Sequence, residues 1–201
     1  MTTTVEADYF ETLHAARPDP FGLRGSWYEQ RKREVLLAAL PRRAYRDAWE
    51  VGCSNGELSA ALAPRCERLL ATDASAHAVA HAEARTRDLP QVRVRQAQHP
   101  RDWPSGTFDL IVFSEIGYYL DVATLEETIR RFAGSLVPDG TFVACHWRHA
   151  FAPAPLDGDR VHARLDANLP WPRIFRYVDA DFVLDGWSGR RDSIAQQEGK
   201  R

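Results

Sequence analysis

Two glycines and a later carboxylate mark the segment of the chain best suited to hold a cofactor. Residues 50–56 read Glu-Val-Gly-Cys-Ser-Asn-Gly and connect a predicted strand to a predicted helix. Gly52 permits a tight turn there, and Gly56 lets a ligand approach the backbone where the helix begins. Asp73 ends the next predicted strand, where doubly wound nucleotide-binding folds place an acid that accepts ribose hydroxyls. Asp73 alone would serve equally as a helix N-cap, but with the glycine turn it indicates a nucleoside-containing ligand.

The spacing of the glycines bears on which nucleoside is bound. The turn has the pattern Gly-x-x-x-Gly, so it lacks the middle glycine that admits a pyrophosphate in the Gly-x-Gly-x-x-Gly turn of dinucleotide-binding proteins. A length of 201 residues also leaves no room for a separate substrate domain. An NAD-dependent dehydrogenase is therefore disfavoured.

A second group of polar and aromatic residues follows the fourth and fifth predicted strands. Ligands bind beside the carboxyl ends of strands in open α/β sheets, so these residues are candidates for the site. Glu115 and His146 are the candidate bases, although Glu115 would equally pair with a charge and His146 would equally be a hydrogen-bonded core histidine. The aromatic members would contact substrate or pack in the core. The group comprises Ser114, Glu115, Tyr118, Tyr119, His146, Trp147 and His149.

Metal binding and thiol catalysis are not expected. The pairs His146/His149 and His77/His81 have suggestive spacings, but no cysteine or carboxylate accompanies either pair at metal-ligand spacing. Cys53 lies in the glycine turn without a histidine or asparagine motif of the kind that activates a nucleophilic cysteine. We expect it to be a small filler residue.

The elements that must position these residues alternate between strands and helices. Alternation of this kind predicts a parallel sheet with helices on both faces and right-handed crossovers, a Rossmann-like doubly wound α/β fold. The run at 108–113 is apolar except for Asp109, as in a strand buried on both faces. The predicted strands are 48–51, 68–72, 92–96, 108–113 and 141–147, and the helices between them are 56–63, 75–87 and 124–137.

The two ends of the chain depart from this alternation. Residues 8–16 and 26–40 predict two helices, the second with Ser26 as N-cap and Glu29 completing a capping box. After a predicted helix at 159–168, only three residues separate strands 174–178 and 182–187, so these two strands must be antiparallel. We therefore expect about seven strands, mostly parallel with the last antiparallel. Residues 1–45 would form a helical cap or lid, 46–187 the core, and 188–201 a flexible tail.

Composition limits the partners. A net charge of −2 and a pI of about 6.4 do not favour nucleic acid or an anionic membrane surface, so the expected partner is a small molecule. Three cysteines without paired spacing favour free thiols in a reducing compartment, and the acidic amino terminus lacks a signal-like apolar run. These features predict a cytoplasmic protein. Whether it is a monomer or a homodimer stays open.

The motifs together resemble those of class I S-adenosylmethionine-dependent methyltransferases. The resemblance rests on the glycine turn, on Asp73, on Phe-Asp-Leu-Ile-Val at 108–112 and on Leu-Val-Pro-Asp-Gly at 136–140. More narrowly, the chain is similar to the NodS-type N-methyltransferases, which act on amino-sugar intermediates of nodulation factors. The segments that carry this narrower resemblance are 26–32, 114–120 and 146–149, and the whole resemblance spans about 8–187.

The resemblance implies S-adenosylmethionine as cofactor and roles for particular residues. Glu50, Gly52, Gly56 and Asp73 would hold the methionine and ribose portions, with Ser114 beside them. Gln98 stands where many relatives present an aspartate to adenine, and its amide carbonyl is also an acceptor. Arg31 and Lys32 would equally lie on a solvated helix face. Alternatively, Trp27, Tyr28 and Arg31 would form a lid, with Arg31 pairing the cofactor carboxylate. Tyr118, Tyr119, Trp147 and His149 would contact the acceptor.

The implied reaction is direct displacement of a methyl group from a sulfonium by an amine on a small, sugar-like or natural-product acceptor. Alignment of the reactants supplies most of the acceleration, and proton removal is secondary. Two alternatives stay open. One is an O-methyltransferase of a secondary metabolite, with His146 as base. The other is a protein that binds S-adenosylmethionine without transferring methyl.

Overall fold

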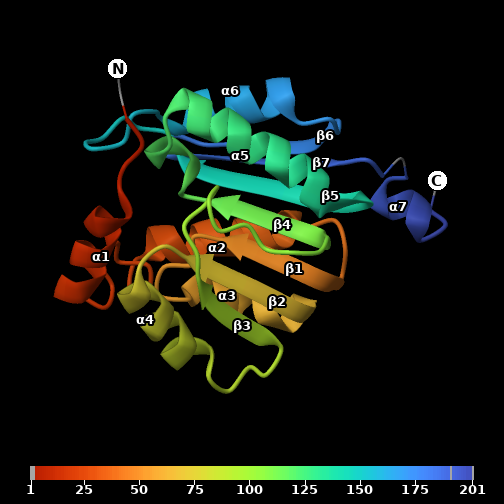
Figure 1. The fold of residues 1–201 in the computed structure, drawn as a ribbon. Helices are drawn as coiled ribbons and strands as arrows, with labels where there is room; N and C mark the ends of the chain where they lie inside the picture. The colour runs from red at the N-terminus through yellow and green to blue at the C-terminus, as the bar shows by residue number, and fades with distance from the viewer. Residues whose placement is uncertain (1–2, 191, 201) are drawn as a thin grey trace.

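A seven-stranded sheet forms the centre of the molecule, in the order β3-β2-β1-β4-β5-β7-β6 (Figure 1). The computed structural model describes residues 3–190 and 192–200. The strands are β1 (Tyr45–Val51), β2 (Cys66–Asp73), β3 (Val92–Gln96), β4 (Phe108–Ser114), β5 (Leu136–Trp147), β6 (Arg173–Val178) and β7 (Phe182–Ser188). The α-helices are α1 (Ala7–Ala16), α2 (Trp27–Ala39), α3 (Glu57–Leu62), α4 (Ala76–Thr86), α5 (Val122–Ser135), α6 (Gly158–Asn168) and α7 (Ile194–Gln197). Two 3₁₀ turns are η1 (Ala63–Arg65) and η2 (Gly117–Tyr119).

The strand directions confirm the predicted doubly wound fold. Strands β1 to β5 pair in parallel, and β7 pairs antiparallel with both β5 and β6. Three residues, 179–181, join β6 to β7, which is too short for a helical crossover. The last strand is therefore the antiparallel one, as the sequence predicts.

Strand β5 is longer than the sequence predicts. The predicted helix at 124–137 ends at Ser135, and β5 already begins at Leu136, which pairs with Phe108 of β4. The register of this pair shifts between Phe108 and Leu110, because the segment containing Pro138 departs from regular pairing. The Leu-Val-Pro-Asp-Gly motif is thus the start of a strand and not a loop before it.

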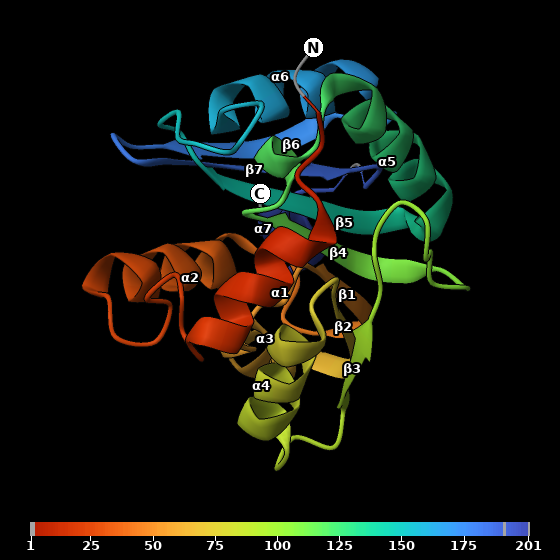
Figure 2. The ribbon, with the colours of Figure 1, turned by 60° about the vertical axis from the view of Figure 1, so that its left-hand side comes forward.

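Alternate residues of the central strands pack into two separate cores. Trp49, Ile111 and Phe113 face α5 and α6, where Phe132 and Leu165 meet them. Their neighbours in the strands face the other side, where Leu36 of α2 and Leu62 of α3 pack. Figure 2 shows α5 and α6 over one face of the sheet and α2, α3 and α4 over the other. Burial on both faces explains why β4 is apolar from Leu110 to Phe113.

The amino-terminal helices lie at the edge of the sheet where the parallel strands end (Figure 2). Helix α2 begins as predicted, with the Ser26 hydroxyl accepting a hydrogen bond from the Glu29 amide at 3.5 Å. The predicted capping box is not completed, because the Glu29 carboxylate turns to Lys32 at 2.9 Å instead. Helix α2 is thereby tied to the interior by a charge.

The carboxyl-terminal segment contains more regular structure than predicted. Ser188 belongs to β7, and residues 194–197 form α7, which begins with a capping box at Ser193. Residues 191 and 201 lie outside the described part of the chain. Within the described ranges no helix combines the length and apolar character needed to cross a membrane.

We expect Gly56→Ala to lower the free energy of unfolding by about 1–3 kcal/mol, because a non-glycine residue is strained at positive φ. Gly56 has φ +80°, and an added Cβ would lie 2.9 Å from the Cα of Ala82. Urea unfolding measures the difference.

Gly134→Ala is the matched control. Gly134 is exposed in α5, and an added Cβ meets no atom within 4 Å. Alanine there should raise the free energy of unfolding by about 0.5–1 kcal/mol. Equal effects of the two substitutions would contradict the tight approach of the turn to α4.

Candidate functional site

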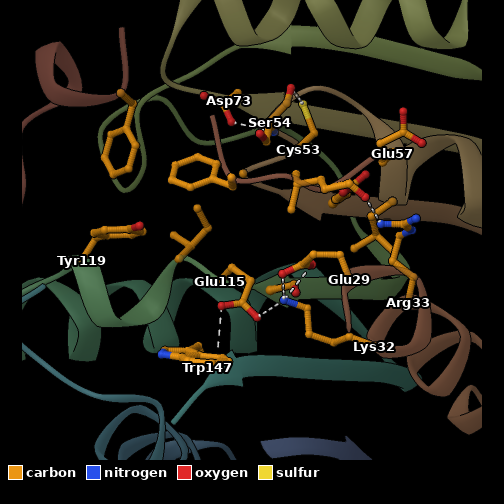
Figure 3. Close-up of a pocket in the computed structure, with 18 of the residues that line it drawn as sticks. Glu29, Lys32, Arg33, Cys53, Ser54, Glu57, Asp73, Glu115, Tyr119 and Trp147 are labelled. Atoms are coloured by element: carbon orange, nitrogen blue, oxygen red, sulfur yellow. Dashed lines mark hydrogen bonds and ion pairs between the residues drawn. The ribbon is translucent and has the colours of Figure 1, made fainter. Parts of the chain in front are cut away.

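A cavity of about 510 Å³ opens at the carboxyl ends of the parallel strands. Figure 3 shows the glycine turn with Asp73 and Ser54 on one side and Glu115, Tyr119 and Trp147 on the other. Helices α1 and α2 supply the remaining wall, from His14 to Arg33. The sheet therefore brings together two groups of residues that are far apart in the sequence.

The glycine turn has the geometry that its composition predicts. Gly52 has φ +77°, and an added Cβ would lie 2.2 Å from the Ile116 side chain. The amides of Gly52 and Cys53 both donate to the Thr72 carbonyl, at 2.8 and 2.9 Å. The turn is thus fixed against the end of β2, close to Asp73.

Asp73 organises the backbone around it and still faces the cavity. Its Oδ2 accepts the Ser54 amide and its Oδ1 accepts the Ser75 amide, each at 2.9 Å. Burial raises the pKa of this carboxyl, although these amides oppose the shift. Each carboxylate oxygen has two acceptor positions, so the capping contacts leave capacity for a ligand. The cap and the ligand interpretations of Asp73 are compatible.

Glu50 lies beneath the turn and is neutral at moderate pH. Burial raises the pKa of its carboxyl to about 8. The Ser59 hydroxyl donates to Oε2 at 2.5 Å. A neutral acid on the cavity wall is a hydrogen-bond donor as well as an acceptor.

Glu115 belongs to an ion cluster centred on Lys32, which we call the Lys32 cluster: Glu29, Lys32 and Glu115. Lys32 Nζ contacts Glu115 Oε1 at 2.7 Å and Glu29 Oε2 at 2.9 Å (Figure 3). Burial opposes the charge of Lys32, but the two carboxylates outweigh it and hold its pKa above the usual range. The interpretation that Lys32 lies on a solvated helix face is wrong, because its side chain is only 7% exposed.

Three predicted substrate residues line the cavity around this cluster. The Tyr118 hydroxyl donates to Glu115 Oε2, and so does the Trp147 amide at 3.2 Å. Tyr119 packs edge-on against Phe10 of α1, with ring centroids 4.8 Å apart. These residues give the acceptor side of the cavity an aromatic wall around one carboxylate.

The structure does not bring Trp27, Arg31 or His149 to the cavity. Trp27 is 65% exposed, Arg31 pairs with Asp179 at 2.7 Å, and His149 pairs with Asp181 at 3.1 Å. Successive helical residues lie about 100° apart around the helix axis. Tyr28 and Lys32 therefore face the cavity, while Trp27 and Arg31, each one residue earlier, point about 100° away from it. Of the three residues expected to form a lid, only Tyr28 therefore lines the cavity.

Arg33 and His14 are lining residues that the sequence did not single out. Arg33 comes from α2 and donates to the Leu23 carbonyl at 2.6 Å. His14 comes from α1, and its Nε2 lies 3.4 Å from the Ser54 hydroxyl of the glycine turn. Each lies one helical turn after another lining residue, Arg33 after Glu29 and His14 after Phe10. This spacing is the only feature of the sequence that could have indicated that they line the cavity.

His146 is not placed to act as a base in the cavity. The imidazole is fully buried and does not line the cavity, and its Nε2 accepts the Gly117 amide at 3.0 Å. Burial lowers its pKa well below the ordinary value. Neighbouring residues of a strand point to opposite faces, so Trp147 faces the cavity and His146 does not. The core-histidine interpretation holds.

Ser114 and Gln98 extend the site along the strand ends. Ser114 lines the main cavity. Gln98 lines a smaller cavity of about 90 Å³, which is also bordered by Asp73, His99 and Phe113. The Gln98 backbone amide donates to Asp102 at 3.0 Å. Among the described residues, no group of three or more histidine, cysteine, aspartate or glutamate side chains is placed to hold a metal.

Comparison with known proteins identifies the family. The family model described as nodulation protein S (NodS) matches residues 6–153. The chain belongs to the NodS family. It is 31% identical over 142 residues to nodulation protein S of Sinorhizobium fredii (strain NBRC 101917 / NGR234), a match that covers 69% of this chain and 66% of that protein. It is 34% identical over 131 residues to nodulation protein S of Bradyrhizobium diazoefficiens (strain JCM 10833 / BCRC 13528 / IAM 13628 / NBRC 14792 / USDA 110), a match that covers 62% of this chain and 61% of that protein. The chain thus spans slightly less than two thirds of these NodS relatives.

Solved structures agree with this NodS assignment. A Pseudomonas syringae protein provisionally assigned as a methyltransferase is 50% identical, with a TM-score of 0.73 over 81% of this chain and 99% of that one. The N-methyltransferase NodS of Bradyrhizobium japonicum WM9, in complex with S-adenosyl-L-homocysteine, has a TM-score of 0.83 at 24% identity, over 92% of this chain and 98% of that one. The NodS-family fold is therefore shared along most of the chain.

We expect Lys32→Met to lower the free energy of unfolding by roughly 2–3 kcal/mol, less than for a fully buried pair because Glu115 is partly solvated. Methionine keeps the apolar stem but leaves two carboxylates facing each other. Urea unfolding at pH 7 measures the loss. The control is Arg87→Met, which removes the exposed ion pair to Asp88 and should change stability by less than about 0.5 kcal/mol.

Glu50→Gln should change how stability depends on pH. The folded pKa of Glu50 is raised to about 8 from an ordinary 4.5, so the folded state binds the extra proton and wild-type stability falls as pH rises between these values. Glutamine cannot ionise. The variant should gain about 2.5 kcal/mol relative to the wild type between pH 5.5 and 7.5, at a slope that approaches roughly 1.4 kcal/mol per pH unit. Urea unfolding at both pH values measures this, and the control is Glu67→Gln, which changes an exposed carboxyl and should show no such gain.

Proposed function

We propose that this NodS-family protein is an S-adenosylmethionine-dependent methyltransferase that methylates an amine on a small acceptor. The observation that carries the proposal is one cavity lined both by the Gly52–Asp73 nucleoside site and by the Glu115 aromatic wall. A donor held by the first group would direct its reactive end toward the second. The NodS structure with bound S-adenosyl-L-homocysteine shares this fold and supports the assignment.

The residues of the turn fit this cofactor. Asp73 retains acceptor positions for the two ribose hydroxyls, Gly52 has no side chain to block the approach, and Ser114 borders the same space. Gln98 is assigned to adenine, because it lines the smaller cavity beyond Asp73. Glu50 and Gly56 shape the turn from below.

The carboxylate of the cofactor requires a cationic partner other than Arg31. Arg33 takes this role in the proposal, because its guanidinium borders the cavity while that of Arg31 is held by Asp179. An arginine fork is well suited to a carboxylate. Tyr28 remains the aromatic member of the lid.

The chemistry needs alignment more than acid–base help. When bound, the cofactor supplies a methyl group on a sulfonium, and the acceptor N–C bond forms as the S–C bond breaks. Tyr118, Tyr119 and Trp147 would hold the acceptor in line, which supplies most of the acceleration. Glu115 is the remaining candidate to take the proton that the nitrogen loses, because it borders the cavity and His146 does not.

The nature of the acceptor follows from the same wall. An amine carried on a sugar-like or other natural-product ring would stack on the tyrosines and face Glu115. The alternative of O-methylation requires His146 as base, but His146 is buried in the core and does not line the cavity. The three buried free cysteines agree with a reducing, cytoplasmic setting.

We expect Asp73→Ala to weaken binding of S-adenosyl-L-homocysteine at least about ten-fold, because hydrogen bonds to a charged group contribute about 1.5–3 kcal/mol each. Isothermal titration measures this. NAD and the exposed-site variant Asp88→Ala serve as controls; the variant should bind as the wild type does. Absence of binding to the wild-type protein would overturn the cofactor assignment.

The acceptor is tested with S-adenosylmethionine and a panel of D-glucosamine, phenethylamine and catechol, followed by mass spectrometry. N-methylated product from either amine is the expected result, and Glu115→Gln should slow its formation. Methylation of catechol alone would favour O-methyl transfer. Cofactor binding without any product would favour a protein that binds the cofactor without transferring methyl.

A further inference from the structure

A chain of buried polar groups runs from the loop after β4 to strand β7, behind the cavity. The Gly117 amide donates a hydrogen bond to His146 Nε2 at 3.0 Å, and His146 Nδ1 is hydrogen-bonded to His162 Nε2 at 3.0 Å. His162 Nδ1 then meets Asp185 Oδ2 at 2.7 Å. The three side chains are at most 1% exposed. We call these three residues the buried relay.

The hydrogen bonds of the relay can run in only one direction. A backbone amide only donates, so His146 Nε2 must be the unprotonated acceptor and its proton lies on Nδ1. That proton is donated to His162 Nε2, which places the proton of His162 on its own Nδ1, facing Asp185. Both imidazoles are then neutral, in agreement with burial, which lowers the pKa of each.

Asp185 sets this direction because it is the end that only accepts. Its second oxygen, Oδ1, faces two arginine side chains of β6, Arg176 at 3.7 Å and Arg173 at 3.9 Å. With the arginines beside Oδ1, Oδ2 is the oxygen that accepts from His162 Nδ1. If the direction were reversed, an Nε2–H of His146 would face the Gly117 N–H.

The relay packs against the loop that carries Glu115. A Cβ added to Gly117 would lie 2.5 Å from Val161 and 3.0 Å from His146 Nε2. Glu115 precedes Gly117 by two residues and has φ +60°, and Tyr118 directly follows Gly117. A residue at positive φ persists only where its surroundings fix it, and the Gly117 amide is one of the fixed points.

We propose that Asp185, acting through His162 and His146, positions the 115–119 loop by fixing the tautomer that accepts the Gly117 amide. His146 and His162 are positioning residues in this arrangement, and no proton is transferred along the relay. The tautomer does not depend on the reaction. The consequence for turnover rests on the proposed methyl transfer.

The direction of the relay is tested by ¹⁵N NMR of the histidine-labelled wild-type protein at pH 7.5. We expect His146 and His162 both to be neutral and protonated at Nδ1, with Nε2 unprotonated. A protonated Nε2 on His146 would overturn the proposal. This measurement needs neither cofactor nor acceptor.

The positioning role is tested by comparing His162→Gln with His162→Leu. Glutamine can accept from His146 with its carbonyl and donate to Asp185 with its amide, so it preserves the direction, whereas leucine breaks it. For His162→Leu we expect about ten-fold faster hydrogen exchange at the Gly117 amide and a kcat about ten-fold lower, using the amine of the panel that turns over fastest. Its affinity for S-adenosyl-L-homocysteine should fall less than kcat, because Ile116 is the loop residue that packs against Gly52, whereas Glu115, Tyr118 and Tyr119 border the acceptor side.

His162→Gln should restore most of the exchange protection and of kcat. A purely structural role would lower the melting temperature of both variants without separating kcat from cofactor affinity, and that result would overturn the proposal. Wild-type exchange at Gly117 in His162→Leu would overturn it as well. If no amine is turned over by the wild-type protein, the proposed function fails, while the exchange and tautomer measurements still decide on the relay.

Discussion

The ammonium of Lys32, enclosed by Glu29 and Glu115, is the contact on which the cavity depends. It joins helix α2 to the end of β4, and Glu115 continues the connection to Tyr118 and the Trp147 amide. Without a cation at this point, two carboxylates would face each other across a largely apolar cavity, which is costly where water is scarce. The cluster thus sets the position of helix α2 and of the Glu115 carboxylate on the acceptor side.

Around this cluster, two buried ionisable groups are held neutral and a third is capped. Glu50 is protonated because it is buried, and His146 is neutral for the same reason. Asp73 keeps acceptor capacity because backbone amides satisfy only part of it. The cavity therefore offers a polar end for a nucleoside and an aromatic end that carries the Glu115 carboxylate, a division that suits a charged donor and an uncharged amine meeting between them.

Membership of the NodS family and the chemistry of the cavity lead to the same proposal by separate routes. The family match covers residues 6–153, which include the turn, Asp73, the β4 loop and most of the lid. The relay through His162 to Asp185 lies beyond that range, on α6 and β7. The part of the chain outside the family match therefore supports the loop inside it.

The sequence by itself determined the alternation of strands and helices, the antiparallel end, the glycine turn and Asp73, because each depends on local spacing: a period, a link of three residues or a glycine at positive φ. Only the tertiary structure decided which candidates meet. Periodicity places Tyr28 and Arg31 on a helix, but not which face turns to the sheet, and alternation in β5 cannot say whether His146 or Trp147 faces the cavity. The Lys32 contact with Glu115 joins residues 83 positions apart, and such a contact forms only when the sheet has brought the strand ends together.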